Sequence, residues 1–132
     1  MTQEFVPYEL ALKLKVLGFD EPCLGFYSIN NQHFKDGYFH ISTENPFSTD
    51  IEPIQQELRC ISAPLYQQAF RWFREKYLLD SWIYCSDENK GYFAIIVSCK
   101  RLMFYNENKN TYEEAEQACL NKLIEIVKGG EQ

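Results

Sequence analysis

Several features on which functional sites are commonly built are scarce in this chain of 132 residues. It has only two histidines and six glycines, and its 13 Lys and Arg against 19 Asp and Glu give a net charge of −6. A chain of this charge offers no general attraction for nucleic acid or for an anionic membrane. Its longest unbroken apolar run, residues 92–97, is far shorter than the roughly 20 residues that span a bilayer. We therefore expect neither nucleic acid nor a membrane among its partners.

The spacings typical of catalytic and cofactor sites are also missing from the sequence. His33 and His40 form neither an HxH nor an HExxH pattern, no serine lies in GxSxG, and the glycines do not follow GxGxxG. The cysteines contain no CxxC pair, which argues against a zinc ribbon or a thioredoxin-like redox motif. We therefore expect no catalytic residue, no metal site and no cofactor.

The cysteines indicate a reducing compartment. Cys23, Cys60, Cys85, Cys99 and Cys119 are odd in number, and all but Cys99 lie next to an apolar residue. This pattern predicts small, buried, reduced thiols, with a disulfide or a nucleophilic cysteine as the alternative. The N-terminus has no basic start followed by an apolar run, so we expect a cytoplasmic protein.

Aromatic residues are the class that the chain has in unusual number. Its 2 Trp, 9 Tyr and 10 Phe make up 16% of the residues, and such large, stiff side chains allow a short chain to build a firm core. The length predicts a single domain over residues 1–132. Residues 43–61 are the least regular stretch, with turn signals at Pro46 and Pro53, and we expect them to form an irregular connection.

Two segments have clear signals for both the start and the end of a helix. Residues 7–17 begin with a proline, repeat leucine at helical spacing and end at Gly18, after which Phe19 can fold back as in a Schellman ending. Another helix is predicted to start at Thr111, whose Thr-Tyr-Glu-Glu sequence matches a capping box, and to run to about Lys128.

A further helix is predicted over residues 63–77, with Ser62 as its N-cap. Its core stripe consists of four aromatic residues, Tyr66, Phe70, Phe73 and Tyr77. At 100° per residue Trp72 lies about 60° from the middle of this stripe, where it either covers the edge of the core or is exposed as an anchor for a partner. In the second case Gln68 and Arg71 would form a polar rim around it.

Strand patterns lie between the helices. Residues 23–29 and 38–42 flank a polar loop, and residues 82–85 and 92–98 flank a second turn, so two hairpins are predicted. Residues 102–105 are a candidate third strand, and both faces of residues 92–98 are apolar, which is typical of an interior strand. The predicted fold is α+β, with three helices packed on an antiparallel sheet made of two β-hairpins, in the order α-ββ-linker-α-ββ(β)-α.

Three phrases of the sequence resemble a family of small uncharacterised proteins from bacterial phages, prophages and other mobile elements. These phrases are residues 5–22, 63–77 and 111–128, which contain the three predicted helices. The family has no assigned catalytic residues, so the resemblance gives no residue of this chain a role. It implies a mobile-element setting, in which small acidic proteins are often accessory factors or binders of host proteins.

Residues 62–128 follow the element order of a double-stranded-RNA-binding domain. Such domains contact phosphates with a Lys-rich cluster at the start of their last helix. Here that turn carries Glu113, Glu114 and Glu116, which would repel phosphate. We therefore attribute the shared order to packing and expect no RNA partner.

These observations predict a small, cytoplasmic, non-enzymatic accessory protein that is a protein-binding module of a mobile element. Its predicted partner site consists of Gln68, Arg71 and Trp72. The alternative is a small-ligand binder or an enzyme with a pocket between the second predicted helix and the sheet, lined by Tyr84, Tyr92 and Arg71.

Overall fold

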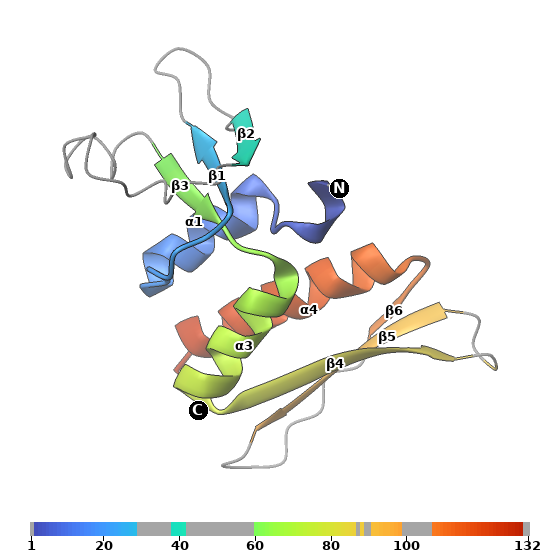
Figure 1. Cartoon of the computed structure of the whole chain (residues 1–132). Helices are drawn as coiled ribbons and strands as arrows, with labels where there is room; N and C mark the ends of the chain where they lie inside the picture. Colours follow the sequence, from blue (N-terminus) through green and yellow to red (C-terminus); the bar gives the residue numbers. More distant parts are fainter. Residues whose placement is uncertain are drawn as a thin grey trace. The chain divides into compact units, whose positions relative to one another are not determined.

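The computed structural model describes residues 2–28, 38–41, 60–86, 88, 91–98 and 107–130. They belong to two compact units, Met1–Leu65 and Tyr66–Gln132, and each unit is described by itself (Figure 1). The predicted α+β class is confirmed. The two predicted hairpins lie in two separate antiparallel sheets, which corrects the expectation that they share one sheet. The assignment of residues 1–132 to a single domain stays a prediction.

The described residues of the first unit form a short 3-10 helix, one α-helix and a three-stranded sheet. Its elements are η1 (Thr2–Glu4), α1 (Tyr8–Leu17), β1 (Gly25–Ser28), β2 (Tyr38–Ile41) and β3 (Cys60–Ala63). The strand order is β2-β1-β3, with both pairings antiparallel, and α1 packs on β3. The pairing of β1 with β2 confirms the first predicted hairpin.

Strand β3 corrects two expectations from the sequence. Ser62 does not cap a helix, because it lies in β3 opposite Phe26 of β1. Ile61 and Ala63, on either side of it, are buried, so the alternation of a half-buried strand overrides the cap-like Ser-Ala-Pro sequence. The predicted irregular connection at 43–61 lies outside the described residues as far as residue 59, and residues 60 and 61 belong to β3.

Helix α1 ends as predicted. Gly18 adopts a left-handed conformation with φ of 101°. Its N–H donates to the Lys15 carbonyl at 3.0 Å, and the N–H of Phe19 donates to the Leu14 carbonyl at 3.0 Å. These two bonds define a Schellman ending, in which glycine adopts the required φ without steric cost. Phe19 is buried, so the helix end also contributes to the core.

An aromatic cluster packs β1 and β2 against the N-terminal residues. The ring centroids of Phe5 and Phe39 are 4.9 Å apart, and those of Tyr27 and Phe39 are 5.5 Å apart. The Tyr27 hydroxyl donates to the Val6 carbonyl at 2.7 Å, and burial raises the pKa of this phenol. A Cβ at Gly25 would lie 2.8 Å from the Phe39 ring and 2.9 Å from the Phe5 ring. Glycine is therefore needed at position 25 for the rings to approach β1.

The described residues of the second unit form two helices and a second three-stranded sheet. Its elements are α3 (Tyr66–Tyr77), β4 (Leu79–Ser86), β5 (Gly91–Ser98), β6 (Glu107–Lys109) and α4 (Tyr112–Lys128). The order β4-β5-β6 places β5 in the middle, which confirms the predicted interior strand and the second hairpin. The candidate strand at 102–105 lies outside the described residues.

The core of the second unit follows the predicted helical stripes. Tyr66, Phe70 and Phe73 of α3 are buried, and Phe73 is fully so. Helix α4 packs on all three strands of its sheet and on α3. Its predicted N-cap is confirmed, since the Thr111 hydroxyl accepts a hydrogen bond of 3.1 Å from the Glu114 N–H. Capping of this kind is typically worth about 1 kcal/mol, so Thr111 fixes where the helix starts.

Leu78, between α3 and β4, holds an unfavourable backbone conformation. Its φ of 58° is left-handed, and its side chain is exposed. This conformation costs a residue with a Cβ roughly 1 kcal/mol, and glycine avoids the penalty. We expect Leu78→Gly to raise the free energy of unfolding by about 0.5–1 kcal/mol in urea denaturation. Leu78→Ala is the matched control, which keeps the Cβ and should give no gain; a Leu78→Gly variant less stable than Leu78→Ala would contradict this account.

Candidate functional site

The three residues predicted as a partner site on α3 do not share an exposed surface. Arg71 is exposed and Gln68 is half-buried, but Trp72 is only 5% exposed. The Trp72 ring packs edge-on against Phe73 at 5.0 Å and Tyr77 at 5.3 Å between centroids. The structure therefore supports the interpretation that Trp72 covers the core, and not the interpretation that it is an exposed anchor. A partner role for Gln68 and Arg71 stays a prediction.

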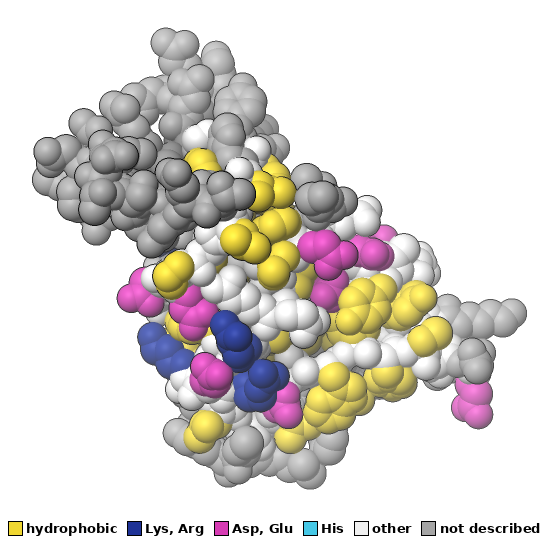
Figure 2. All heavy atoms as spheres, viewed as in Figure 1, with side chains coloured by type: hydrophobic (Ala, Val, Ile, Leu, Met, Phe, Trp, Pro, Cys, Tyr) yellow, Lys and Arg dark blue, Asp and Glu magenta, His cyan; other side chains and the backbone are white. Residues whose placement is uncertain are grey.

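Among the described residues of the second unit, two of the three exposed aromatic side chains, Trp82 and Tyr84, lie instead on β4, and the third is Tyr112 of α4. The antiparallel register sets Trp82 opposite Ile95 and Tyr84 opposite Phe93. Residues directly opposite one another in such a pair project from the same side of the sheet. We call this side, formed by Trp82, Tyr84, Phe93 and Ile95, the outer face. Figure 2 shows hydrophobic side chains at the surface along β4.

The local sequence explains why these side chains are on the outer face. The alternate residues of β5, Ala94 and Ile96, are fully buried, and α4 packs on β5, so the other face of the sheet is covered by helix. Because successive residues of a strand point to opposite faces, the outer face receives the side chains that alternate with these. Trp82 is 48% exposed and Tyr84 is 37% exposed. Large aromatic side chains are thus held at the surface by the same register that builds the core.

The outer face is rigid at its aromatic end. The Tyr84 and Phe93 rings stack with centroids 5.3 Å apart and an interplanar angle of 20°. Strands β4 and β5 are paired along the whole of both strands, from Leu79 with Ser98 to Ser86 with Gly91. Side chains fixed in this way lose little freedom when another molecule covers them, which favours binding.

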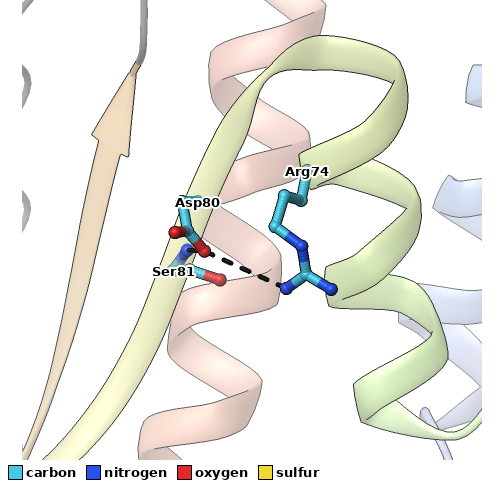
Figure 3. A network of polar contacts seen from close by, with 3 residues as sticks. All are labelled: Arg74, Asp80 and Ser81. Carbon is cyan, nitrogen blue, oxygen red and sulfur yellow. Dashed lines mark hydrogen bonds and ion pairs between the residues drawn. The ribbon is translucent and has the colours of Figure 1, made fainter.

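A polar group marks the end of β4 that follows α3 (Figure 3). Asp80 Oδ1 accepts a hydrogen bond of 2.9 Å from the Ser81 N–H and lies 4.0 Å from Arg74 Nη1. Both charged side chains are about half exposed, so water screens the ion pair and its contribution to stability is small. The ion pair positions the guanidinium of Arg74 beside the start of β4.

Burial makes Cys119 unsuitable as a nucleophile. This α4 thiol is fully buried, and burial raises its pKa to about 12. The nearby Glu116 charge raises this pKa further, whereas interaction with the Ser81 side chain lowers it. The Ser81 hydroxyl makes no hydrogen bond of standard geometry. Because the thiolate is the reactive form, a thiol with this pKa is inert at neutral pH.

The other cysteines correct part of the sequence expectation. Cys23 is buried and Cys85 is exposed, and both are free thiols, as is Cys119. The expectation that every cysteine is buried is therefore wrong for Cys85, which lies near the end of edge strand β4. The side chains of Cys60 and Cys99 lie outside the described residues.

The register does not bring together the predicted ligand pocket. Tyr84 pairs with Phe93, whereas Tyr92 is the next residue along β5 and pairs with Cys85, so Tyr84 and Tyr92 lie on opposite faces. Tyr92 contacts Tyr112 of α4, with 5.9 Å between ring centroids. Among the residues that the structure describes, no group of three or more His, Cys, Asp or Glu side chains is placed to hold a metal ion. His33 and the side chain of His40 lie outside those residues.

Comparisons with protein-family models, with curated proteins and with solved structures find no match to this chain. In the described part of the structure, no helix combines the length and the apolar character needed to cross a membrane.

The difference in burial predicts which thiols react in the folded protein. Cys85 should be labelled rapidly by a thiol reagent at pH 7.5, whereas Cys23 and Cys119 should be labelled only as the protein unfolds. Peptide mass spectrometry after timed labelling measures each site, and Cys85→Ser is the control that should remove the rapid reaction. After denaturation without reductant we expect five reactive thiols. Labelling of Cys119 as fast as Cys85 would contradict the placement of α4 over the sheet.

Proposed function

We propose that this chain is a small, cytoplasmic, non-enzymatic accessory protein of a mobile element that binds a protein partner through its outer face. The observation that carries the proposal is the pair of exposed aromatic side chains, Trp82 and Tyr84, on a rigid strand. Trp and Tyr are among the residues enriched at the energetic centres of protein interfaces. A partner that covers both rings removes apolar surface from water at roughly 25 cal/mol per Å².

The chemistry of the outer face favours a protein over a small ligand. Its aromatic and aliphatic side chains form part of a strand surface, whereas a small-ligand site is concave and directs several polar groups at one point. Cys119, a fully buried thiol of α4, is held in its unreactive form by burial. These features support a binding module over an enzyme.

Charge indicates what kind of partner suits this face. With a net charge of −6, the chain attracts proteins with a basic rim around an apolar centre more readily than acidic ones. Glu113 and Glu114 are exposed in the first turn of α4, where a duplex-RNA binder presents cations to phosphate. We therefore propose a protein partner and no nucleic acid. The mobile-element setting rests on the resemblance of residues 5–22, 63–77 and 111–128.

The proposal is tested by partner recovery with matched surface variants. Tagged wild-type protein, Trp82→Ala, Tyr84→Ala and Arg71→Glu are used to capture proteins from the lysate of the native host, with quantitative mass spectrometry as the readout. The outer-face variants should recover at least tenfold less of a specific partner, equivalent to about 1.4 kcal/mol. Arg71→Glu, on the exposed flank of α3, tests the partner site predicted from the sequence, and it should recover the partner unchanged if the outer face is the interface.

Circular dichroism and thermal melting establish that each variant is folded before capture. Loss of the partner with Arg71→Glu alone would place the interface on α3 and contradict the proposal that the outer face binds the partner. Folded Trp82→Ala and Tyr84→Ala variants that both keep every partner would contradict it as well. Duplex RNA at physiological salt is included as a ligand that none of the four proteins should bind.

A further inference from the structure

Strand β4 is a long edge strand whose middle carries no charge. It spans eight residues, and among the described strands it pairs only with β5. The opposite edge of the sheet, β6, has three residues. Residues 81–85 include neither a charge nor a proline, which are the features that usually protect an edge from pairing with another strand. The edge formed by β4 is therefore suited to receive a further strand.

We propose that two copies of this chain pair through β4, antiparallel and about a two-fold axis at Ile83, so that their two three-stranded sheets join into one. This pairing does not depend on the proposed function, because it uses the backbone edge of the sheet and leaves the outer face open. It extends that function by joining the outer faces of the two copies into one continuous aromatic surface.

The register about Ile83 is favoured by the side chains that it sets opposite one another. Trp82 lies opposite the partner's Tyr84, and by symmetry Tyr84 lies opposite the partner's Trp82. Cross-strand aromatic pairs of this kind stabilise antiparallel sheets. A shift of the axis to Trp82 would instead place the Asp80 carboxylate opposite the partner's Tyr84. Only the axis at Ile83 pairs all four aromatic side chains without a charge opposite a ring.

Charges at the two ends of β4 select an antiparallel second copy. Arg74 and Lys76 lie in the last turn of α3, and the Arg74 guanidinium is held at the start of β4 beside Asp80 (Figure 3). Glu88, which is exposed, follows the other end of the strand. Antiparallel pairing brings Arg74 of each copy toward the partner's Glu88, whereas parallel pairing would bring like charges together. This complementarity occurs twice in the dimer, and salt screens it.

The first test measures association of the full chain in solution. Sedimentation velocity between 1 and roughly 100 µM should show a monomer of 15.6 kDa converting to a dimer of twice that mass. Arg74→Glu and Glu88→Arg should each weaken the dimer at least fivefold, and the double variant should recover most of that loss. Glu125→Arg, on the exposed side of α4, makes the same charge change as Glu88→Arg and should leave the dimer unaffected. A wild-type chain that stays monomeric over this range overturns the proposal, as does a double variant as weak as the single ones.

The second test reads the register directly. In a Cys85→Ser background, Ile83→Cys places one thiol of each copy at the two-fold axis, and mild oxidation with diamide should join the copies by a disulfide. Glu88→Cys in the same background is the control, because its thiols would be roughly 30 Å apart across the axis and should not join. Cross-linking of Glu88→Cys with none of Ile83→Cys overturns the register. Circular dichroism verifies folding of both variants, and the sedimentation result decides the pairing if Ile83→Cys does not fold.

These outcomes are separable from the test of the proposed function. Loss of the dimer with Glu88→Arg while partner recovery persists would support the edge pairing and leave the outer face as a separate binding surface. A monomeric wild-type chain whose Trp82→Ala variant still loses its partner would overturn the edge pairing alone.

Discussion

The antiparallel register between β4 and β5 is the constraint on which the second unit depends. It sets Ser81 opposite Ile96 and Trp82 opposite Ile95, so that each strand sends alternate side chains toward the helices and away from them. A shift by one residue would move Trp82 into the helix-covered side and turn the buried small residues outward. The hydrophobic core, the protection of Cys119 and the exposure of the β4 aromatics are therefore consequences of one pairing.

The abundance of aromatic residues serves two different purposes in this chain. In the first unit Phe5 and Phe39 pack over Gly25, and Tyr27 packs on Phe39, so that the rings hold short strands together. In the second unit Phe73 fills the centre of the core, and Trp82 remains at the surface. Buried rings compensate for the small size of each unit, because large side chains bury much surface per residue. The Trp82 ring keeps 48% of its surface exposed and so contributes less to the core, which is why it indicates a binding surface.

Local signals in the sequence predicted the parts of the fold that local interactions determine. The helix end at Gly18, the cap at Thr111 and the interior position of residues 92–98 were all predictable, since each depends on neighbours in the chain. The strand at Cys60–Ala63 was not, because its pairing partner β1 lies more than 30 residues away and Ser62 before Pro64 also matches a helix start. For the same reason the sequence suggested one sheet, where the structure has two.

The candidate site shows the same limit of sequence reasoning. Trp72 was predicted as a possible anchor, but helical geometry alone placed it at a border and left its burial undecided, and Trp82 was not among the predicted site residues. The alternation of Trp82 and Tyr84 along a strand could have indicated a shared face, yet only the packing of α4 on the other side determines that these two side chains are exposed. Exposure is a property of the tertiary structure, so a sequence pattern can nominate such residues without separating the buried one from the exposed one.

The most direct test of this account uses the two tryptophans, which are the only ones in the chain. Acrylamide quenching of fluorescence is measured on two folded single-tryptophan variants, Trp72→Phe, which reports Trp82, and Trp82→Phe, which reports Trp72. The account predicts strong quenching of Trp82 and weak quenching of Trp72, because their exposed fractions are 48% and 5%. Equal quenching of the two, or stronger quenching of Trp72, would contradict the register of β4 with β5 and the outer face built on it.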